Sequence, residues 1–166
     1  MTKELETSFL SALNQYQHKL LRICSIYSIN EEDRKDLFQE VMMRIWQAMP
    51  SFKAKSSLET WMFRIAINTC LRFRSDVNKK QEKIVRMNSF DIEILGVQED
   101  NTDHGKLLLK LRHCIKELNE SNKAITALYL EGLPYKEISA ITGISENTIA
   151  VKMKRIKKKL LNCLNA

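Results

Sequence analysis

The sequence contains few of the residues that interrupt helices, with only 4 glycines and 2 prolines among 166 residues. Glycine and proline dominate the turns that connect β-strands, so this scarcity disfavours a β-rich fold and favours an all-helical one. No N-terminal signal peptide is recognisable, and no apolar run is long enough to span a bilayer. We therefore expect a cytoplasmic protein without membrane insertion.

The sequence also lacks a metal-binding pattern. Its four cysteines (Cys24, Cys70, Cys114 and Cys163) form no CxxC pair, and its three histidines are not spaced as zinc ligands. No pairing of a nucleophile with a base is apparent either, so we predict neither a metal, nor a cofactor, nor an enzyme. In a reducing cytoplasm the cysteines are expected to be structural thiols.

Apolar residues recur at steps of three and four along most of the chain, as they do in amphipathic helices. The first such stripe consists of Phe9, Leu13, Tyr16, Leu20, Ile23 and Tyr27. A second helix is predicted to begin after Asn30, a suitable cap, and to stop before Pro50. A third should open at Ser56, which stands at capping-box spacing from Glu59, and should end near Ser75.

The helical pattern decays in the middle of the chain, where residues 87–105 hold five acidic and no basic side chains. We read this part as a connector, because helical periodicity returns after it. The sequence therefore predicts two small helical domains, residues 1–78 and 107–166, joined by a flexible linker over residues 79–106.

The net charge of +7 is concentrated in two blocks. Residues 51–86 hold nine basic and three acidic side chains, and residues 146–166 hold six basic and one acidic. Charge blocks are often only solvated surfaces, but two of them on either side of an acidic connector indicate two contacts with one polyanion. A membrane surface is a poorer partner, because neither block has a free apolar face.

Residues 133–154 have the outline of a DNA-reading helix-turn-helix. A first helix is predicted over Tyr135 to Thr142, ended by Gly143 in the left-handed conformation, and Ser145 can cap the second. The apolar stripe of the second helix is Ile149, Met153, Ile156 and Leu160. A plain helical hairpin with a solvated, lysine-rich end is the alternative. The turn, the cap and the one-sided basic charge together favour DNA.

Other stretches resemble a known family. Residues 36–41 and 44–46, then Phe52-Lys53, then residues 60–68 resemble the second conserved region of bacterial sigma factors. The helix-turn-helix resembles their fourth region, and the short connection resembles the extracytoplasmic-function group of the sigma-70 family.

The resemblance implies a protein that binds core RNA polymerase, directs it to promoters and helps to open the duplex. Its partners would be core polymerase, promoter DNA (both duplex and melted non-template strand) and an anti-sigma factor. Two other functions stay open: a stand-alone helix-turn-helix regulator that acts without polymerase, and a protein-interaction adaptor with a basic surface.

The resemblance also implies three sets of site residues. The polymerase-binding candidates share one polar ridge of a helix and are Asp36, Gln39, Glu40 and Arg44. The minus-ten candidates would capture an unstacked base or hold phosphates, and are Phe52, Lys53, Lys55, Phe63, Arg64, Asn68 and Arg72. The minus-thirty-five candidates are Ser145, Asn147, Thr148, Lys152 and Arg155, with Lys157, Lys158 and Lys159 adding nonspecific affinity.

Four aromatic and basic residues lie in or beside the minus-ten set. Phe63 suits the hydrophobic core as well as the pocket, and Trp61 suits the core better than DNA. Arg74 is expected to join the phosphate contacts. Arg72 stands where many family members have an acidic residue.

Overall fold

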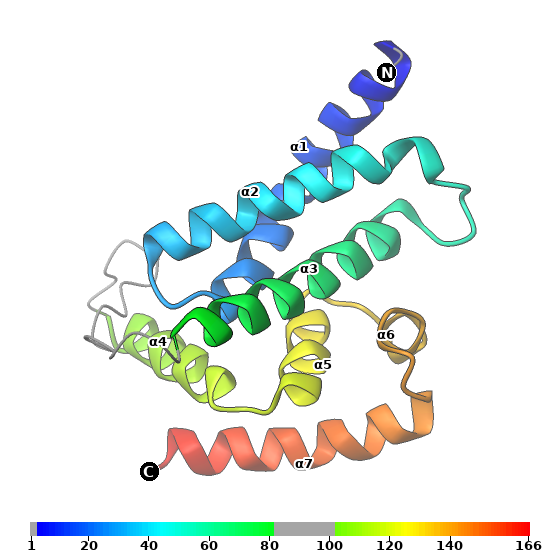
Figure 1. Cartoon of the computed structure of the whole chain (residues 1–166). Coiled ribbons are helices and arrows are strands. Elements are labelled where there is room, and N and C mark those ends of the chain that lie inside the picture. The colour runs from blue at the N-terminus through cyan, green and yellow to red at the C-terminus, as the bar shows by residue number, and fades with distance from the viewer. Residues whose placement is uncertain (1–2, 82–101) are drawn as a thin grey trace. The chain divides into compact units, whose positions relative to one another are not determined.

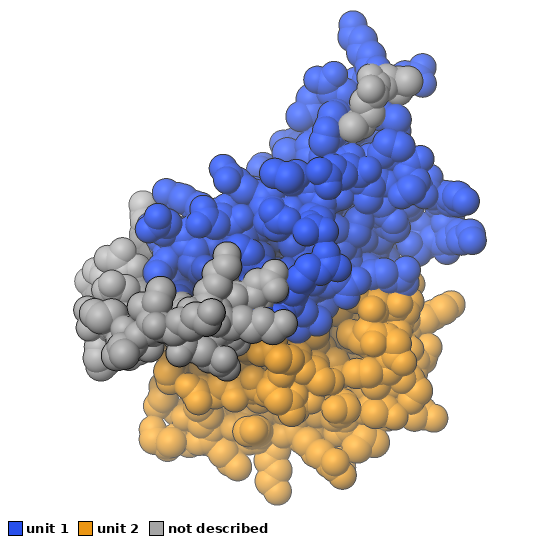
Figure 2. Space-filling model, in the orientation of Figure 1, with its two compact units in different colours: residues 1–93 blue, residues 94–166 orange. Residues whose placement is uncertain are grey.

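The computed structural model describes residues 3–81 and 102–166, without the side chains of residues 76–81. The described residues form seven α-helices and one short 3-10 turn, with no strand among them (Figure 1). The chain divides into two compact units, Met1–Glu93 (unit 1) and Ile94–Ala166 (unit 2), coloured separately in Figure 2. The prediction of an all-α protein with two helical domains is confirmed.

Unit 1 consists of α1 (Lys3–Tyr27), α2 (Glu31–Ala48), the 3-10 turn η1 (Met49–Ser51) and α3 (Leu58–Gln81). The three helices pack pairwise, each turning its apolar stripe inward. The residues that are fully buried between them include Leu20, Ile23, Leu37, Val41, Ile45, Met62 and Phe63.

The helix starts in unit 1 follow from local side-chain capping. Asn30 Oδ1 accepts a hydrogen bond of 2.8 Å from the backbone N–H of Asp33, so the predicted cap of α2 is confirmed. The cap of α3 is Ser57, whose Oγ accepts a hydrogen bond of 3.1 Å from the N–H of Thr60. The expected opening of this helix at Ser56 was therefore wrong by one residue.

The expected linker over residues 79–106 is helical at both ends. Helix α3 continues past the predicted end at Ser75 to Gln81, and the next helix begins at Asp103. The segment after Ser75 contains lysine and glutamine but neither glycine nor proline, so nothing in it ends the helix. Residues 82–101, the larger part of the expected linker, lie outside the described residues.

The three helices of unit 1 meet at a buried ion pair. Arg74 of α3 donates hydrogen bonds of 2.9 Å to Asp33 Oδ2 and to the backbone carbonyl of Tyr27. The same Asp33 oxygen accepts the N–H of Ile29 at 2.9 Å. The side chains of Arg74 and Asp33 are only 11% and 13% exposed, respectively. The expectation that Arg74 contacts phosphate was wrong, because its guanidinium is held inside unit 1.

Unit 2 consists of α4 (Asp103–Lys116), α5 (Glu120–Leu130), α6 (Tyr135–Thr142) and α7 (Glu146–Leu164). Helix α7 contacts each of the other three, and α4 contacts α5 as well as α7. The most buried core side chains are Ile115, Ile125, Leu128, Ile138, Ile149, Met153 and Ile156.

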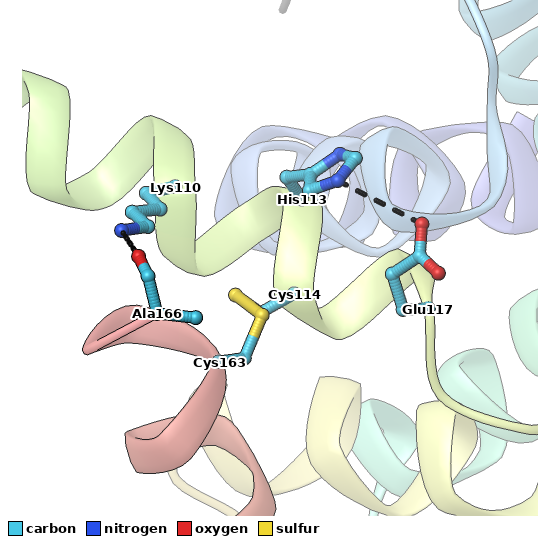
Figure 3. Close-up of a disulfide and its surroundings, with 6 residues drawn as sticks. All are labelled: Lys110, His113, Cys114, Glu117, Cys163 and Ala166. Atoms are coloured by element: carbon cyan, nitrogen blue, oxygen red, sulfur yellow. Dashed lines mark hydrogen bonds and ion pairs between the residues drawn. A yellow bond between two sulfur atoms is a disulfide. The ribbon is translucent and has the colours of Figure 1, made fainter.

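A disulfide joins Cys114 of α4 to Cys163 near the end of α7 (Figure 3). The prediction of four thiols was wrong for this pair, whereas Cys24 and Cys70 are free and buried. The two bonded cysteines are 49 residues apart, and the chain-entropy cost of closing a loop of that size in the unfolded state is about 4 kcal/mol. Their positions on apolar stripes indicated burial, but gave no sign of pairing.

We predict that Arg74→Ala lowers the free energy of unfolding of unit 1 by about 3 kcal/mol, because the carboxylate of Asp33 then loses its buried cationic partner. Urea denaturation followed by circular dichroism measures this. Arg72→Ala removes the same kind of side chain from an exposed position of the same helix and should cost no more than about 0.5 kcal/mol. Equal losses in the two variants would contradict the structural role of Arg74.

Candidate nucleic-acid interface

The turn between α6 and α7 has the predicted geometry. Gly143 has φ 77°, a left-handed conformation in which an L side chain is strained, and its N–H donates to the carbonyl of Ser139 at 2.9 Å. Ser145 Oγ accepts the N–H of Thr148 at 3.3 Å and donates to Thr148 Oγ1 at 2.8 Å. The helix bounds, the glycine stop and the cap are all confirmed. The Ser145 hydroxyl is thus already engaged in holding the helix start.

Helix α7 separates a buried stripe from a polar face. Ile149, Met153 and Ile156 are buried. The exposed or half-exposed side chains away from that stripe include the acidic Glu146 in the first turn, followed by Asn147, Thr148, Lys152, Lys154, Arg155, Lys158 and Lys159. The structure therefore brings together the minus-thirty-five candidates at the N-terminal half of one helix, which is the part that a helix-turn-helix places in the major groove.

Val151 stands in the middle of this polar face, and sequence reasoning passed over it. It is 51% exposed and lies one turn after Asn147, with Lys154 and Arg155 one turn further on. An apolar side chain at such a place can contact the methyl group of thymine. Its position two residues after buried Ile149 was the signal in the sequence, because residues two apart do not share a helix face.

Lys157 is directed toward α5. Its Nζ lies 4.8 Å from the centroid of the Tyr129 ring, a cation–π distance. The hydrogen bond with the Tyr129 side chain raises the pKa of Lys157 from an ordinary value that is already far above neutrality, so the ammonium stays charged. Of the three lysines expected to add nonspecific affinity, this one has an aromatic partner within unit 2.

The polymerase-binding candidates share one face of α2. Asp36 and Gln39 are exposed, and Glu40 and Arg44 form an ion pair of 2.9 Å between Oε1 and Nε. The buried residues Leu37, Val41 and Ile45 lie on the other side of the helix. We call the four candidates the α2 ridge.

Met43 lies within the α2 ridge, one turn from Gln39 and Glu40, and is 52% exposed. A flexible, polarisable thioether on a surface suits a partner that must fit closely. The four polar residues of the α2 ridge therefore surround one exposed apolar side chain, that of Met43.

One face of α3 carries three of the seven minus-ten candidates. Arg64, Asn68 and Arg72 follow each other at steps of four, and Trp61 is three residues before the first of them. Asn68 and Arg72 are exposed, and Arg64 is half-exposed. The ring of Phe52 packs on Trp61 with 5.0 Å between centroids. Lys53 and Lys55 are exposed in the loop that follows Phe52.

Phe63 and Trp61 of α3 differ in burial. Phe63 is fully buried and packs edge-on against Tyr16, with 6.5 Å between ring centroids. It has no exposed ring face for a base. Trp61 is half-exposed on the same side as Asn68. The assignment of Phe63 to a base pocket was therefore wrong, and so was the assignment of Trp61 to the core.

Two further features of the described residues limit the chemistry. Over residues 3–81 and 102–166 no three His, Cys, Asp or Glu side chains come together as metal ligands. None of the described helices combines the length and the apolar character that crossing a bilayer requires.

Comparison with known proteins matches the two units to two conserved regions. Residues 12–80 match the family model of sigma-70 region 2, and residues 108–160 match that of sigma-70 region 4. The chain is 27% identical over 157 residues to the ECF RNA polymerase sigma-E factor of Escherichia coli strain K12, covering 89% of this chain and 82% of that protein.

Solved structures show the same fold. The sigma factor RpoE from Bartonella quintana, solved in complex with the anti-sigma factor NepR, superposes with a TM-score of 0.76 at 23% identity over 96% of this chain and 98% of that one. CnrH, solved in complex with the cytosolic domain of CnrY, gives 0.70 at 18% identity over 96% and 89% of the two chains.

The two regions, in this order and at this length, define a transcription initiation factor and not an enzyme. The chain belongs to the sigma-70 family of RNA polymerase sigma factors, within its extracytoplasmic-function group.

Proposed function

We propose that this sigma factor acts in the cytoplasm and divides promoter recognition between its units. The α2 ridge would bind core polymerase, the exposed face of α3 with Phe52 would hold melted non-template strand, and α7 would read the minus-thirty-five duplex. The observation that supports the proposal is that α2, α3 and α7 each present candidate residues on one exposed face, opposite a buried stripe.

The holoenzyme should bind a promoter more tightly than either DNA-binding unit does alone. Two modest sites on one chain act at a high effective concentration once polymerase fixes their spacing. Promoter binding by the free protein should therefore be much weaker than binding by the holoenzyme. A gel shift with and without core polymerase tests this, and equal binding in the two cases would favour a stand-alone regulator.

An anti-sigma protein is the further partner that we propose. Two structures with this fold were solved with such a partner or with a cytosolic domain of another protein bound. An inhibitor that covers the α2 ridge or the face of α7 would block recruitment without any change in the fold of either unit.

We predict that Glu40→Arg weakens binding to core polymerase about tenfold, because it reverses a charge in the α2 ridge and breaks the ion pair with Arg44. Biolayer interferometry with immobilised core polymerase measures the affinity. Glu6→Arg makes the same charge change at an exposed position of α1 and should leave the affinity unchanged. If Glu40→Arg binds like wild type, Glu40 lies outside the interface.

Asn68→Ala should impair strand opening more than recruitment. The amide can hydrogen-bond the edge of an unstacked base, a contact that exists only after melting. Permanganate reactivity of the promoter reports opening, and filter binding at low temperature reports recruitment. Asn14→Ala, at an exposed position of α1, is the matched control. A variant of Asn68 that loses both steps equally would contradict a role confined to the melted strand.

Val151→Ala should reduce the preference for the best minus-thirty-five sequence over a scrambled duplex about fivefold, roughly 1 kcal/mol, through loss of an apolar base contact. Selection from a randomised duplex pool with holoenzyme finds the preferred sequence, and competition binding then gives the ratio. Leu161→Ala shortens an equally exposed apolar residue of α7 (58% exposed) beyond the reading half, and should leave the ratio intact. An unchanged ratio for Val151→Ala would show that the residue does not contribute to specificity.

A further inference from the structure

The disulfide of unit 2 lies at the C-terminal turns of two helices. Cys114 is the third residue from the end of α4, and Cys163 is the last but one of α7 (Figure 3). The two sulfurs differ in access, because Cys114 is only 2% exposed whereas Cys163 is half-buried. A small molecule in solution therefore reaches Cys163 first.

The bond joins two parts of unit 2 that have few buried side chains. Past Ile156, no residue of α7 is buried, and Leu161 is largely exposed. The first turns of α4 expose Leu107 and Leu108. One hydrogen bond of 3.0 Å, from Lys110 Nζ to the carbonyl of Ala166, accompanies the disulfide. The noncovalent packing of α4 is centred on its C-terminal half, where Ile115 is buried, so the first turns of α4 and the last turns of α7 are the parts that the disulfide constrains most.

The helix-turn-helix does not depend on this bond in the same way. Its core is formed by Ile125 and Leu128 of α5, Ile138 of α6 and Ile149 of α7, all fully buried. These side chains pack together at the opposite end of α7 from Cys163. Opening the disulfide should therefore loosen α4 and the last turns of α7 while the reading half keeps its structure.

We propose that Cys114 and Cys163 form a reversible thiol–disulfide modification site, oxidised by small-molecule disulfides such as oxidised glutathione, that controls how firmly α4 and the last turns of α7 are held. In the cytoplasm, the location proposed above, the glutathione pool keeps thiols reduced. The dithiol is then the resting form, and the bond forms under oxidising conditions.

The chemistry proceeds by two exchanges. The Cys163 thiolate attacks one sulfur of oxidised glutathione, the S–S bond breaks, and one glutathione thiolate leaves. The Cys114 thiolate then attacks the Cys163 sulfur, breaks the mixed disulfide and releases the second glutathione. Two protein thiols lose two electrons and two protons, and the two glutathione molecules gain them. Reduction is the reverse.

The other two cysteines provide an internal reference. Cys24 and Cys70 are fully buried in unit 1. Burial, with the hydrogen bond to Cys24 as a lesser cause, raises the pKa of the Cys70 thiol well above its ordinary value. A buried, protonated thiol is a poor nucleophile. Oxidised glutathione should therefore leave this pair as thiols.

Loosening the last turns of α7 would lower the affinity for any DNA duplex. The exposed lysines Lys158 and Lys159 lie in the turns that the disulfide holds, beyond the reading half. Contacts of lysine with phosphate are independent of sequence. Oxidation should therefore strengthen binding to any duplex and leave discrimination between sequences unchanged.

The test is performed on the full chain in buffers of graded ratios of reduced to oxidised glutathione. Acid quenching, alkylation and peptide mass spectrometry give the state of each cysteine. Amide hydrogen exchange in the same samples reports local opening. Cys163→Ser and Cys114→Ser cannot form the bond. Cys24→Ala is the matched control that keeps it.

We expect one disulfide, between Cys114 and Cys163, with Cys24 and Cys70 alkylated as thiols throughout. Oxidation should slow amide exchange about tenfold in residues 103–116 and 157–164, and by much less in α5 and α6. Both serine variants should exchange like the reduced protein in every buffer, whereas Cys24→Ala should respond like wild type.

Three outcomes would overturn the proposal: no bond in oxidised glutathione, equal exchange in the two redox states, or a change that extends over all of unit 2. Because the reduced wild type is itself a measured state, the result does not depend on the folding of any variant. None of these readouts uses polymerase or DNA. A negative result would therefore overturn the redox proposal without bearing on the proposed function.

Discussion

Unit 1 depends on one buried ion pair. Arg74 contacts Asp33 and the carbonyl of Tyr27, and thereby fixes the C-terminal third of α3 to the connection between α1 and α2. The two candidate surfaces of this unit lie on α2 and α3, so a fixed angle between these helices determines where polymerase and the melted strand would be held. A salt bridge of this kind is directional, unlike apolar packing, which tolerates sliding. The pair therefore contributes to position as well as to stability.

Helices α2, α3 and α7 share one arrangement, a buried apolar stripe opposite an exposed polar face. Each helix turns one stripe into a core and offers another to a partner, so most substitutions on either side have a defined effect. Met43 and Val151 are exposed apolar residues on otherwise polar faces. Their exposure has no benefit for folding, since burying apolar surface is favourable. Contact with a partner explains their placement better than stability does.

Much of the fold was predictable because it is encoded locally. The scarcity of glycine and proline, the apolar periodicity and the caps at Asn30 and Ser145 act over a few residues, and the structure agrees with them. Apart from the start and the end of α3, which were local errors, the errors concern interactions between distant residues. Arg74 and Asp33 are 41 residues apart, and Cys114 and Cys163 are 49 apart. Trp61 was wrongly expected in the core, and Phe63 was left open between core and pocket. A two-residue step moves a side chain to the other side of a helix, and only the tertiary neighbours decide which side is buried.

The cap of α7 restricts which residues natural variation can place at position 145. The Ser145 hydroxyl holds the helix start, and only serine, threonine, asparagine and aspartate cap well there. The cap also borders the surface that we assign to DNA, where Glu146 already contributes one exposed carboxylate. Aspartate at position 145 would suit the helix but would add a second negative charge beside the phosphates. Orthologous sequences should accordingly divide this position among the three neutral residues, and their divergence in promoter preference should arise further along the helix.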